Sequence, residues 1–204
     1  VAAKMGGTDA SSNSRLRLAL SKANASNVPK DTVKRAIDKA SGQNNENFEE
    51  ITYEGYGPKG IAVIIECLTD NKNRTVSDLR HLLSKHGGSL GTNGSVSHLF
   101  RKVGIMKLND ISEDDLIEHM ESIDIEDFEM IDSDCIIFTK PTELFSTKKY
   151  FESKSINVIE EEIIMDPLTS IDVSKEDSEK ISDLSNKIEE LDDVQNVYMN
   201  SNLT

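Results

Sequence analysis

The chain has 204 residues, 36% of them hydrophobic and 5% aromatic, a composition suited to two or three small domains rather than one large one. Its net charge of −14 is uneven, because residues 1–105 carry 15 Lys and Arg against 10 Asp and Glu, whereas residues 106–204 carry 8 against 27. No stretch has the length of a membrane span, and neither the two cysteines nor the four histidines have the spacing of a disulfide framework or a metal site. We therefore expect a cytoplasmic protein without a metal or cofactor, whose basic half is the only candidate surface for a polyanion.

The N-terminal part predicts a short helix at residues 1–5 and two longer helices at residues 14–25 and 30–41, followed by a polar linker at residues 43–47. Two short helices bury little surface alone, so we expect a segment before residue 1 to complete a small helical domain. The basic residues of its outer surface are Arg15, Arg17, Lys22, Lys30, Lys34 and Arg35. This surface either contacts a polyanion or is only solvated.

Residues 51–56 and 61–68 are β-branched runs that flank the turn sequence Gly-Pro-Lys-Gly, which predicts a hairpin. A helix follows at residues 74–85, then a loop with four glycines, then a short strand at residues 95–100. The glycine loop could bind an anion through its N–H groups. Because it follows a helix instead of opening one, it is more typical of a connector, with Gly87 as the helix cap.

The helix at residues 74–85 separates into an apolar face and a polar stripe at 100° per residue. The stripe consists of Arg74, Asp78, His81 and Lys85. One interpretation is a backbone contact for a polyanion, with His81 contributing charge only when protonated. The other is a solvated face in which Asp78 pairs with Arg74 and Lys85 at helical spacing.

Residues 104–166 predict strands at 105–108, 127–131, 135–139 and 157–165, with helices at 112–122 and 142–153. This βαββαβ order is typical of a ferredoxin-like domain. A final helix at 175–191 and strand at 194–199 have no partner sheet nearby, so we expect them to return to the hairpin. The predicted fold is α+β in three domains: a helical domain at 1–46, a discontinuous α/β domain at 47–103 plus 167–204, and an inserted ferredoxin-like domain at 104–166.

Four segments of the chain resemble the YebC/PmpR family: NVPKDTVKRAI, ITYEGYGPKG, IECLTDNKNRTVSDLRHLLSKHGGSLGTNGSVSHLF and DDVQNVY. The resemblance implies three domains and a role in gene expression. Members are described as probable transcriptional regulatory proteins that bind DNA, a mitochondrial relative is a translational activator of cytochrome oxidase subunit one, and other bacterial members are similar to factors that relieve stalled ribosomes. Members also begin with a basic segment containing a GHSKW-like motif, so the resemblance implies that this chain is N-terminally truncated.

The resemblance favours a nucleic-acid contact at the basic residues of both N-terminal parts. The candidate residues are Arg74, His81 and Lys85 of the stripe, together with the six basic residues of the helical domain. The resulting hypothesis is a DNA-binding transcriptional regulator, and the alternative is a ribosome-associated translation factor that contacts ribosomal RNA or mRNA. No nucleophile, base and orienting group can be named, so we expect neither an enzyme nor a small-molecule substrate.

Overall fold

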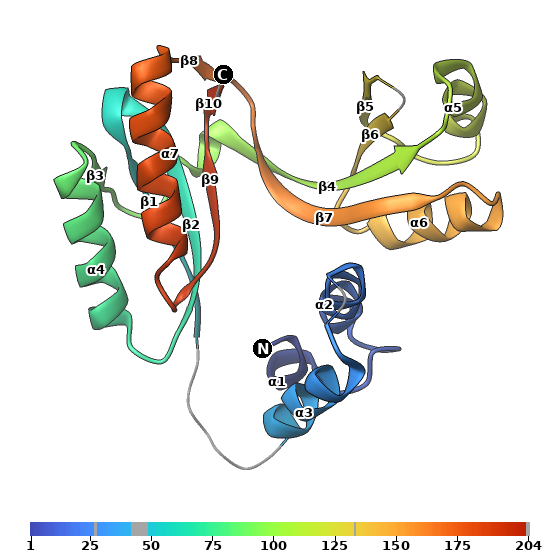
Figure 1. The fold of residues 1–204 in the computed structure, drawn as a ribbon, viewed down its shortest axis with the longest axis horizontal. Helices are drawn as coiled ribbons and strands as arrows, with labels where there is room; N and C mark the ends of the chain where they lie inside the picture. Colours follow the sequence, from blue (N-terminus) through green and yellow to red (C-terminus); the bar gives the residue numbers. More distant parts are fainter. Residues whose placement is uncertain (27, 42–48, 133, 203–204) are drawn as a thin grey trace. The chain divides into compact units, whose positions relative to one another are not determined.

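The computed structural model describes residues 1–26, 28–41, 49–132 and 134–202, which form two compact units (Figure 1). One unit contains Val1–Asn45 and Val103–Ile163, and the other contains Glu46–Lys102 and Ile164–Thr204. Within the described residues, the chain passes between the units along two ten-residue strands, β4 (Phe100–Asn109) and β7 (Val158–Pro167). The linker expected at residues 43–47 lies outside the described residues.

The N-terminal segment forms the three predicted helices, α1 (Ala2–Gly6), α2 (Ser14–Ala25) and α3 (Lys30–Ser41). Asn13 organises their junction, since its side chain caps α2 by accepting from the Leu16 N–H at 3.0 Å and donates to the Ala2 carbonyl at 2.7 Å. Among the side chains that the structure describes here, Ala2, Ala3 and Leu16 are buried, and Ala10, Leu20, Ile37 and Ala40 pack against them.

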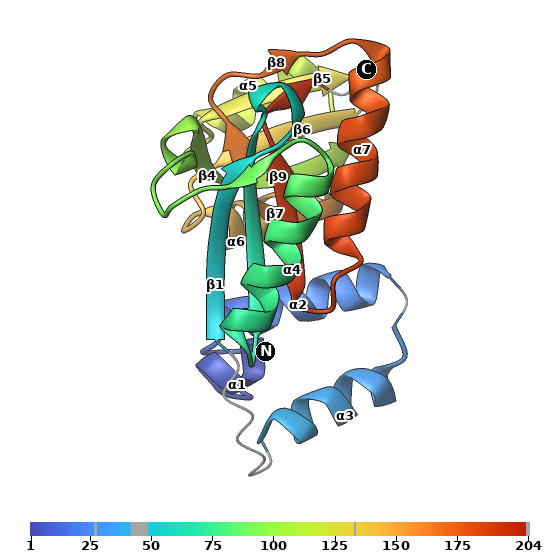
Figure 2. The ribbon, with the colours of Figure 1, turned by 90° about the vertical axis from the view of Figure 1, so that its left-hand side faces the viewer.

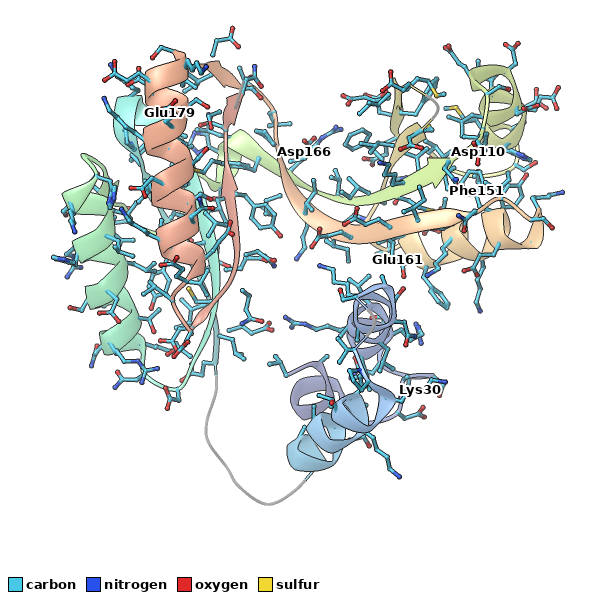
Figure 3. The ribbon with its side chains drawn as sticks, in the orientation of Figure 1. Lys30, Asp110, Phe151, Glu161, Asp166 and Glu179 are labelled. Atoms are coloured by element: carbon cyan, nitrogen blue, oxygen red, sulfur yellow. The ribbon has the colours of Figure 1, made fainter. Side chains whose placement is uncertain are left out.

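The inserted module has the predicted ferredoxin-like order, with α5 (Glu113–Met120), β5 (Asp127–Ile131), β6 (Asp134–Thr139) and α6 (Leu144–Ser153) between β4 and β7. Its sheet order is β5-β6-β4-β7, which confirms the prediction. Alternate residues of each strand face the two helices, and Phe151 of α6, labelled in Figure 3, is fully buried in their common core.

The second unit contains the predicted hairpin of β1 (Glu49–Tyr56) and β2 (Ala62–Thr69), followed by α4 (Lys72–Lys85) and the two-residue strand β3 (Ser89–Leu90). After β7 the chain adds β8 (Ile171–Asp172), α7 (Lys175–Glu189), β9 (Val194–Met199) and β10 (Ser201–Asn202). The sheet order is β3-β1-β2-β9, so the C-terminal helix and strand return to the hairpin, as predicted.

Helices α4 and α7 lie side by side on one face of this sheet (Figures 1 and 2). Between the helices and the sheet is a core with fully buried side chains from β2, α4 and α7, which are Val63, Ile65, Leu79, Leu83, Leu184 and Ile188. The apolar stripe of α4 is therefore committed to packing, and its polar stripe points away from the sheet.

The predicted short strand at residues 95–100 is wrong. Ser97–Leu99 is a turn of 3-10 helix, and β4 begins only at Phe100. The backbone N–H groups of Val96 and Ser97 bond to the carboxylate of Glu54 instead of to a neighbouring strand.

Within the described part of the chain, no helix combines the length and the apolar character needed to cross a bilayer.

Candidate nucleic-acid interface

The polar stripe of α4 lies on a helix whose ends are well defined. Asn71 accepts a hydrogen bond from the Arg74 N–H at 3.1 Å and caps the N-terminus, and Gly87 follows the C-terminus with φ of 79°, a conformation that glycine adopts without strain. Because Leu79 and Leu83 are buried against the sheet, the opposite face is exposed to solvent. All four predicted stripe residues lie on this exposed face.

Arg74 differs from the other cations of the stripe because two carboxylates hold its guanidinium group. Its Nη2 lies 2.8 Å from Asp193 Oδ1 and 2.8 Å from Asp70 Oδ1. The hydrogen bond to Asp193 and then that to Asp70 raise the pKa of Arg74. The alternative in which Asp78 pairs with Arg74 and Lys85 is not formed, since Asp78 has no ion pair among the residues that the structure describes.

Asp193 joins three elements at the turn between α7 and β9. Besides Arg74, its carboxylate accepts from the Thr75 hydroxyl of α4 at 2.8 Å, and its backbone carbonyl accepts from the Leu68 N–H of β2 at 2.7 Å. Burial alone would raise the pKa of Asp193, but the hydrogen bonds from Arg74 and Thr75 outweigh burial and hold the pKa below its ordinary value. The residue is 9% exposed and is part of the framework.

The acidic pocket beside Asp193 disfavours phosphate binding at the first half of α4. It has a volume of about 450 Å³, and Arg74 is its only basic residue. Its carboxylates are Asp78, Glu190, Asp192 and Asp193. A phosphate approaching this pocket would meet a surplus of negative charge.

The second half of α4 presents Arg80, His81 and Lys85, all exposed. Across the described ranges, none of the three forms an ion pair with a carboxylate. Arg80 was not included in the predicted stripe, because it lies about 100° around the helix from His81. Its signal in the sequence was only its position beside His81. The structure therefore exposes two predicted residues, His81 and Lys85, and also Arg80, which sequence reasoning missed.

The glycine loop does not leave its N–H groups open to an anion. The buried carboxylate of Glu54 on β1 accepts from the N–H groups of Gly94, Val96 and Ser97 at 2.8, 2.7 and 2.8 Å. Burial alone would raise the pKa of Glu54, but these donors, led by Val96, lower the pKa below its ordinary value. The protein therefore supplies its own anion, which supports the connector interpretation.

A close backbone approach fixes the start of the same loop. A Cβ atom at Gly88 would lie 2.2 Å from the carbonyl oxygen of Tyr56, so any larger residue would push the loop away from β1. The phenol of Tyr56 donates to the Ser95 carbonyl at 3.0 Å. Glycine is needed here for packing, and no ligand is required to explain it.

The six basic candidates of the helical segment differ in how far they are occupied. Arg17 donates to the carbonyls of Ala10 and Ser11 at 2.8 and 2.7 Å and lies 4.4 Å from the ring centroid of Phe145. Lys22 forms an ion pair with Glu162. The side chains of Arg15, Lys30 and Lys34 are exposed, and Figure 3 labels Lys30. The side chain of Arg35 lies outside the described part of the structure.

Replacing Asp193 by alanine is expected to lower the free energy of unfolding by about 2 kcal/mol, because the Thr75 hydroxyl loses its charged acceptor in a buried position. Urea unfolding of the full chain measures this effect. Asp192→Ala removes the same charge from an exposed neighbour and should leave the urea midpoint unchanged. Equal destabilisation by the two variants would contradict the structural role of Asp193.

Acid should weaken the fold through Glu54 and Asp193, whose pKa values are both lowered in the folded protein from ordinary values of 4.5 and 3.8. Their contribution is complete above these unfolded values and is lost as the pH falls through the folded ones. The free energy of unfolding should therefore fall as the pH drops below about 5. Urea titrations across this range should show a shallower pH slope for Asp193→Asn than for the unmodified chain.

Comparison with known proteins adds the family. Residues 1–43 match the profile of the TACO1/YebC N-terminal domain, and residues 48–201 match that of the TACO1/YebC second and third domain. The chain belongs to the TACO1/YebC family. The resemblance found in the four sequence segments is thereby confirmed over nearly the whole chain.

Similar family members come from several bacteria. A protein of Thermoanaerobacter pseudethanolicus named "Probable transcriptional regulatory protein" is 46% identical over 203 residues, which cover 98% of this chain and 82% of that protein. One of the same name from Acidithiobacillus ferrooxidans is 44% identical over 206 residues, covering 100% and 82%. The crystal structure of a conserved hypothetical protein from Aquifex aeolicus superposes with a TM-score of 0.87 at 38% identity, covering 100% of this chain and 86% of that one. The fold of this chain is therefore also found in the Aquifex aeolicus protein.

Proposed function

We propose that this TACO1/YebC protein is a DNA-binding regulator of transcription whose second unit contacts the phosphate backbone through the second half of α4. The observation that carries the proposal is the exposed group of Arg80, His81 and Lys85, which no described carboxylate neutralises. The names of the similar bacterial proteins, probable transcriptional regulatory proteins, support the same role.

The proposed contact is to phosphate rather than to base edges. The guanidinium group of Arg80 can hold two phosphate oxygens at once, whereas Lys85 acts as a point charge five residues further along α4. Arg74 lies beside the proposed contact and is not part of it, because Asp193 and Asp70 already compensate its charge. Such contacts fix position on the duplex and depend strongly on salt.

We propose a second contact on the helical segment, through the exposed residues Arg15, Lys30 and Lys34. Arg17 and Lys22 would add charge there only after giving up Phe145 and Glu162. Arg35 belongs to the same proposed surface by its place in the sequence. The two surfaces, on different units, would together raise affinity beyond that of either one.

The proposed role is binding without catalysis, in the cytoplasm, by three domains at residues 1–46, 47–103 plus 167–204, and 104–166. The separate cores of the helical segment, the inserted module and the hairpin sheet support this division. The boundary between the first and second domains falls at residues that the structure does not describe.

A direct test selects genomic duplex fragments on the immobilised chain and compares their affinity with that of random duplex at the same salt concentration. The proposal expects selected fragments that bind at least about tenfold more tightly than random duplex. Equal affinities would contradict a sequence-selective regulator. Preferential binding of single-stranded RNA or ribosomes in the same assay would favour the translation factor considered in the sequence analysis.

A further inference from the structure

The inserted module has a second sheet face that its two helices do not cover. Helices α5 and α6 pack on the side of Met106, Leu108 and Ile137. By strand alternation, Ile105 and Ile136 point to the opposite side, and so does Ile131, whose side chain is 50% exposed. We call these three isoleucines on β4, β5 and β6 the open-face isoleucines.

Carboxylates border the open-face isoleucines on both sides. On β5, Glu129 pairs in register with Ile136 and therefore points to the open face. Asp127 lies two residues before Glu129 on the same strand, so its side chain points to the same face. On β7, Glu161 is buried and pairs with Lys148 of α6, so it faces the helices, and by alternation its neighbours Glu160 and Glu162 point to the open face. The acidic rim therefore consists of Asp127, Glu129, Glu160 and Glu162.

The inserted module as a whole is negatively charged, like its acidic rim. Residues 103–163 contain five lysines and no arginine against 17 acidic residues, a net charge of −12. Nucleic-acid phosphates would be repelled here, although an uncovered four-stranded sheet is a surface that many proteins use for binding. Charge complementarity thus favours a basic partner.

The chain itself shows which side chain this rim accepts. Lys22, from α2 of the same unit, forms an ion pair with Glu162 on the rim, and Lys107 lies 2.7 Å from Asp134 on the open face. Asp127, Glu129 and Glu160 have no ion-pair partner among the described residues. Rim carboxylates therefore remain for further cations next to apolar surface.

We propose that the open face of β5, β6 and β4 docks a basic amphipathic segment of another protein. Its lysine or arginine side chains pair with Asp127, Glu129 and Glu160, while its apolar side chains cover the open-face isoleucines. The charge pairing orients the docked segment and speeds its association, and the burial of the isoleucines stabilises the complex. This surface is separate from the proposed DNA contact on α4 and does not depend on it.

The test uses the full chain with isotope-labelled isoleucine methyl groups and a short peptide of Lys-Lys-Leu repeats as the probe. The proposal expects saturable shifts of Ile105, Ile131 and Ile136 that a Glu-Glu-Leu peptide does not cause. Asp127→Lys with Glu129→Lys should lower the affinity for the Lys-Lys-Leu peptide by about tenfold or more. The matched control, Glu118→Lys on α5 with Glu121→Lys directly after it, changes the net charge equally and should leave affinity within about twofold.

Three results would overturn the proposal. Equal weakening by both double variants would show attraction by net charge alone. Shifts of the same methyl groups by duplex DNA would identify the face as a nucleic-acid surface, and concentration-dependent shifts without any peptide would identify it as a contact between two copies of the chain. Ile136→Thr keeps the preference for a β-strand and the net charge. It should lower the affinity for the peptide without changing the urea midpoint.

Discussion

Replacing Glu54 by glutamine is expected to lower the free energy of unfolding by about 3 kcal/mol, the largest single effect that we expect in this protein. Glu54 is 5% exposed, and its two oxygens serve the N–H groups of Gly94, Val96 and Ser97. Glutamine keeps the shape but removes the charge, and it must leave one backbone donor facing an NH2 group. Urea unfolding and hydrogen exchange at the loop amides measure both consequences.

The matched control for Glu54→Gln lies on the same strand. Glu49 is exposed and forms only a surface ion pair with Lys72, so Glu49→Gln should not change the urea midpoint measurably. If Glu54→Gln left both the stability and the exchange of the Val96 amide unchanged, the loop would not depend on this carboxylate. The anion-binding interpretation of the glycine loop would then return.

Reversing two charges on α4 should have the largest effect on function. Arg80→Glu with Lys85→Glu is expected to weaken binding of duplex DNA by about 50-fold or more at 0.1 M salt, since each lost phosphate contact costs about tenfold there and the new carboxylates add repulsion. Both side chains are exposed, so the fold should be unaffected. Fluorescence anisotropy with the full chain measures the affinity.

The matched control reverses two lysines on the neighbouring helix α7, Lys175→Glu with Lys180→Glu, and changes the net charge equally. Helix α7 carries three lysines against five acidic residues, whereas α4 carries four basic residues against one aspartate. We therefore expect less than about threefold loss from the α7 control. Arg74 is a poor test residue, because a carboxylate in its place would face Asp193 and Asp70 and would disturb the fold.

Sequence patterns located the repeating elements well, since burial imposes a period on them. The helix at residues 14–25 and the strands at residues 127–131 and 194–199 have the observed bounds. The return of the last helix and strand to the hairpin followed from their lack of any other partner. Register within the sheet and the two-residue strand β3 had no such pattern, because two residues cannot show a period.

The contacts that define the site could not be predicted, because they join side chains far apart in the sequence. Arg74 and Asp193 are 119 residues apart, and Glu54 meets a loop about 40 residues later. A helical wheel shows which charges share a stripe, but it cannot show that Asp193 already holds Arg74. For the same reason it gave no ground for preferring Arg80 to Arg74.

The central claim, that α4 binds DNA through phosphate contacts, is tested most directly by the salt dependence of affinity. Duplex binding by the full chain and by Arg80→Gln with Lys85→Gln is measured over a range of salt concentrations. We expect the slope of log affinity against log salt to be less steep by about 1.8 in the variant, since each phosphate contact contributes about 0.9. Identical slopes in the two proteins would contradict the claim and place the contact elsewhere.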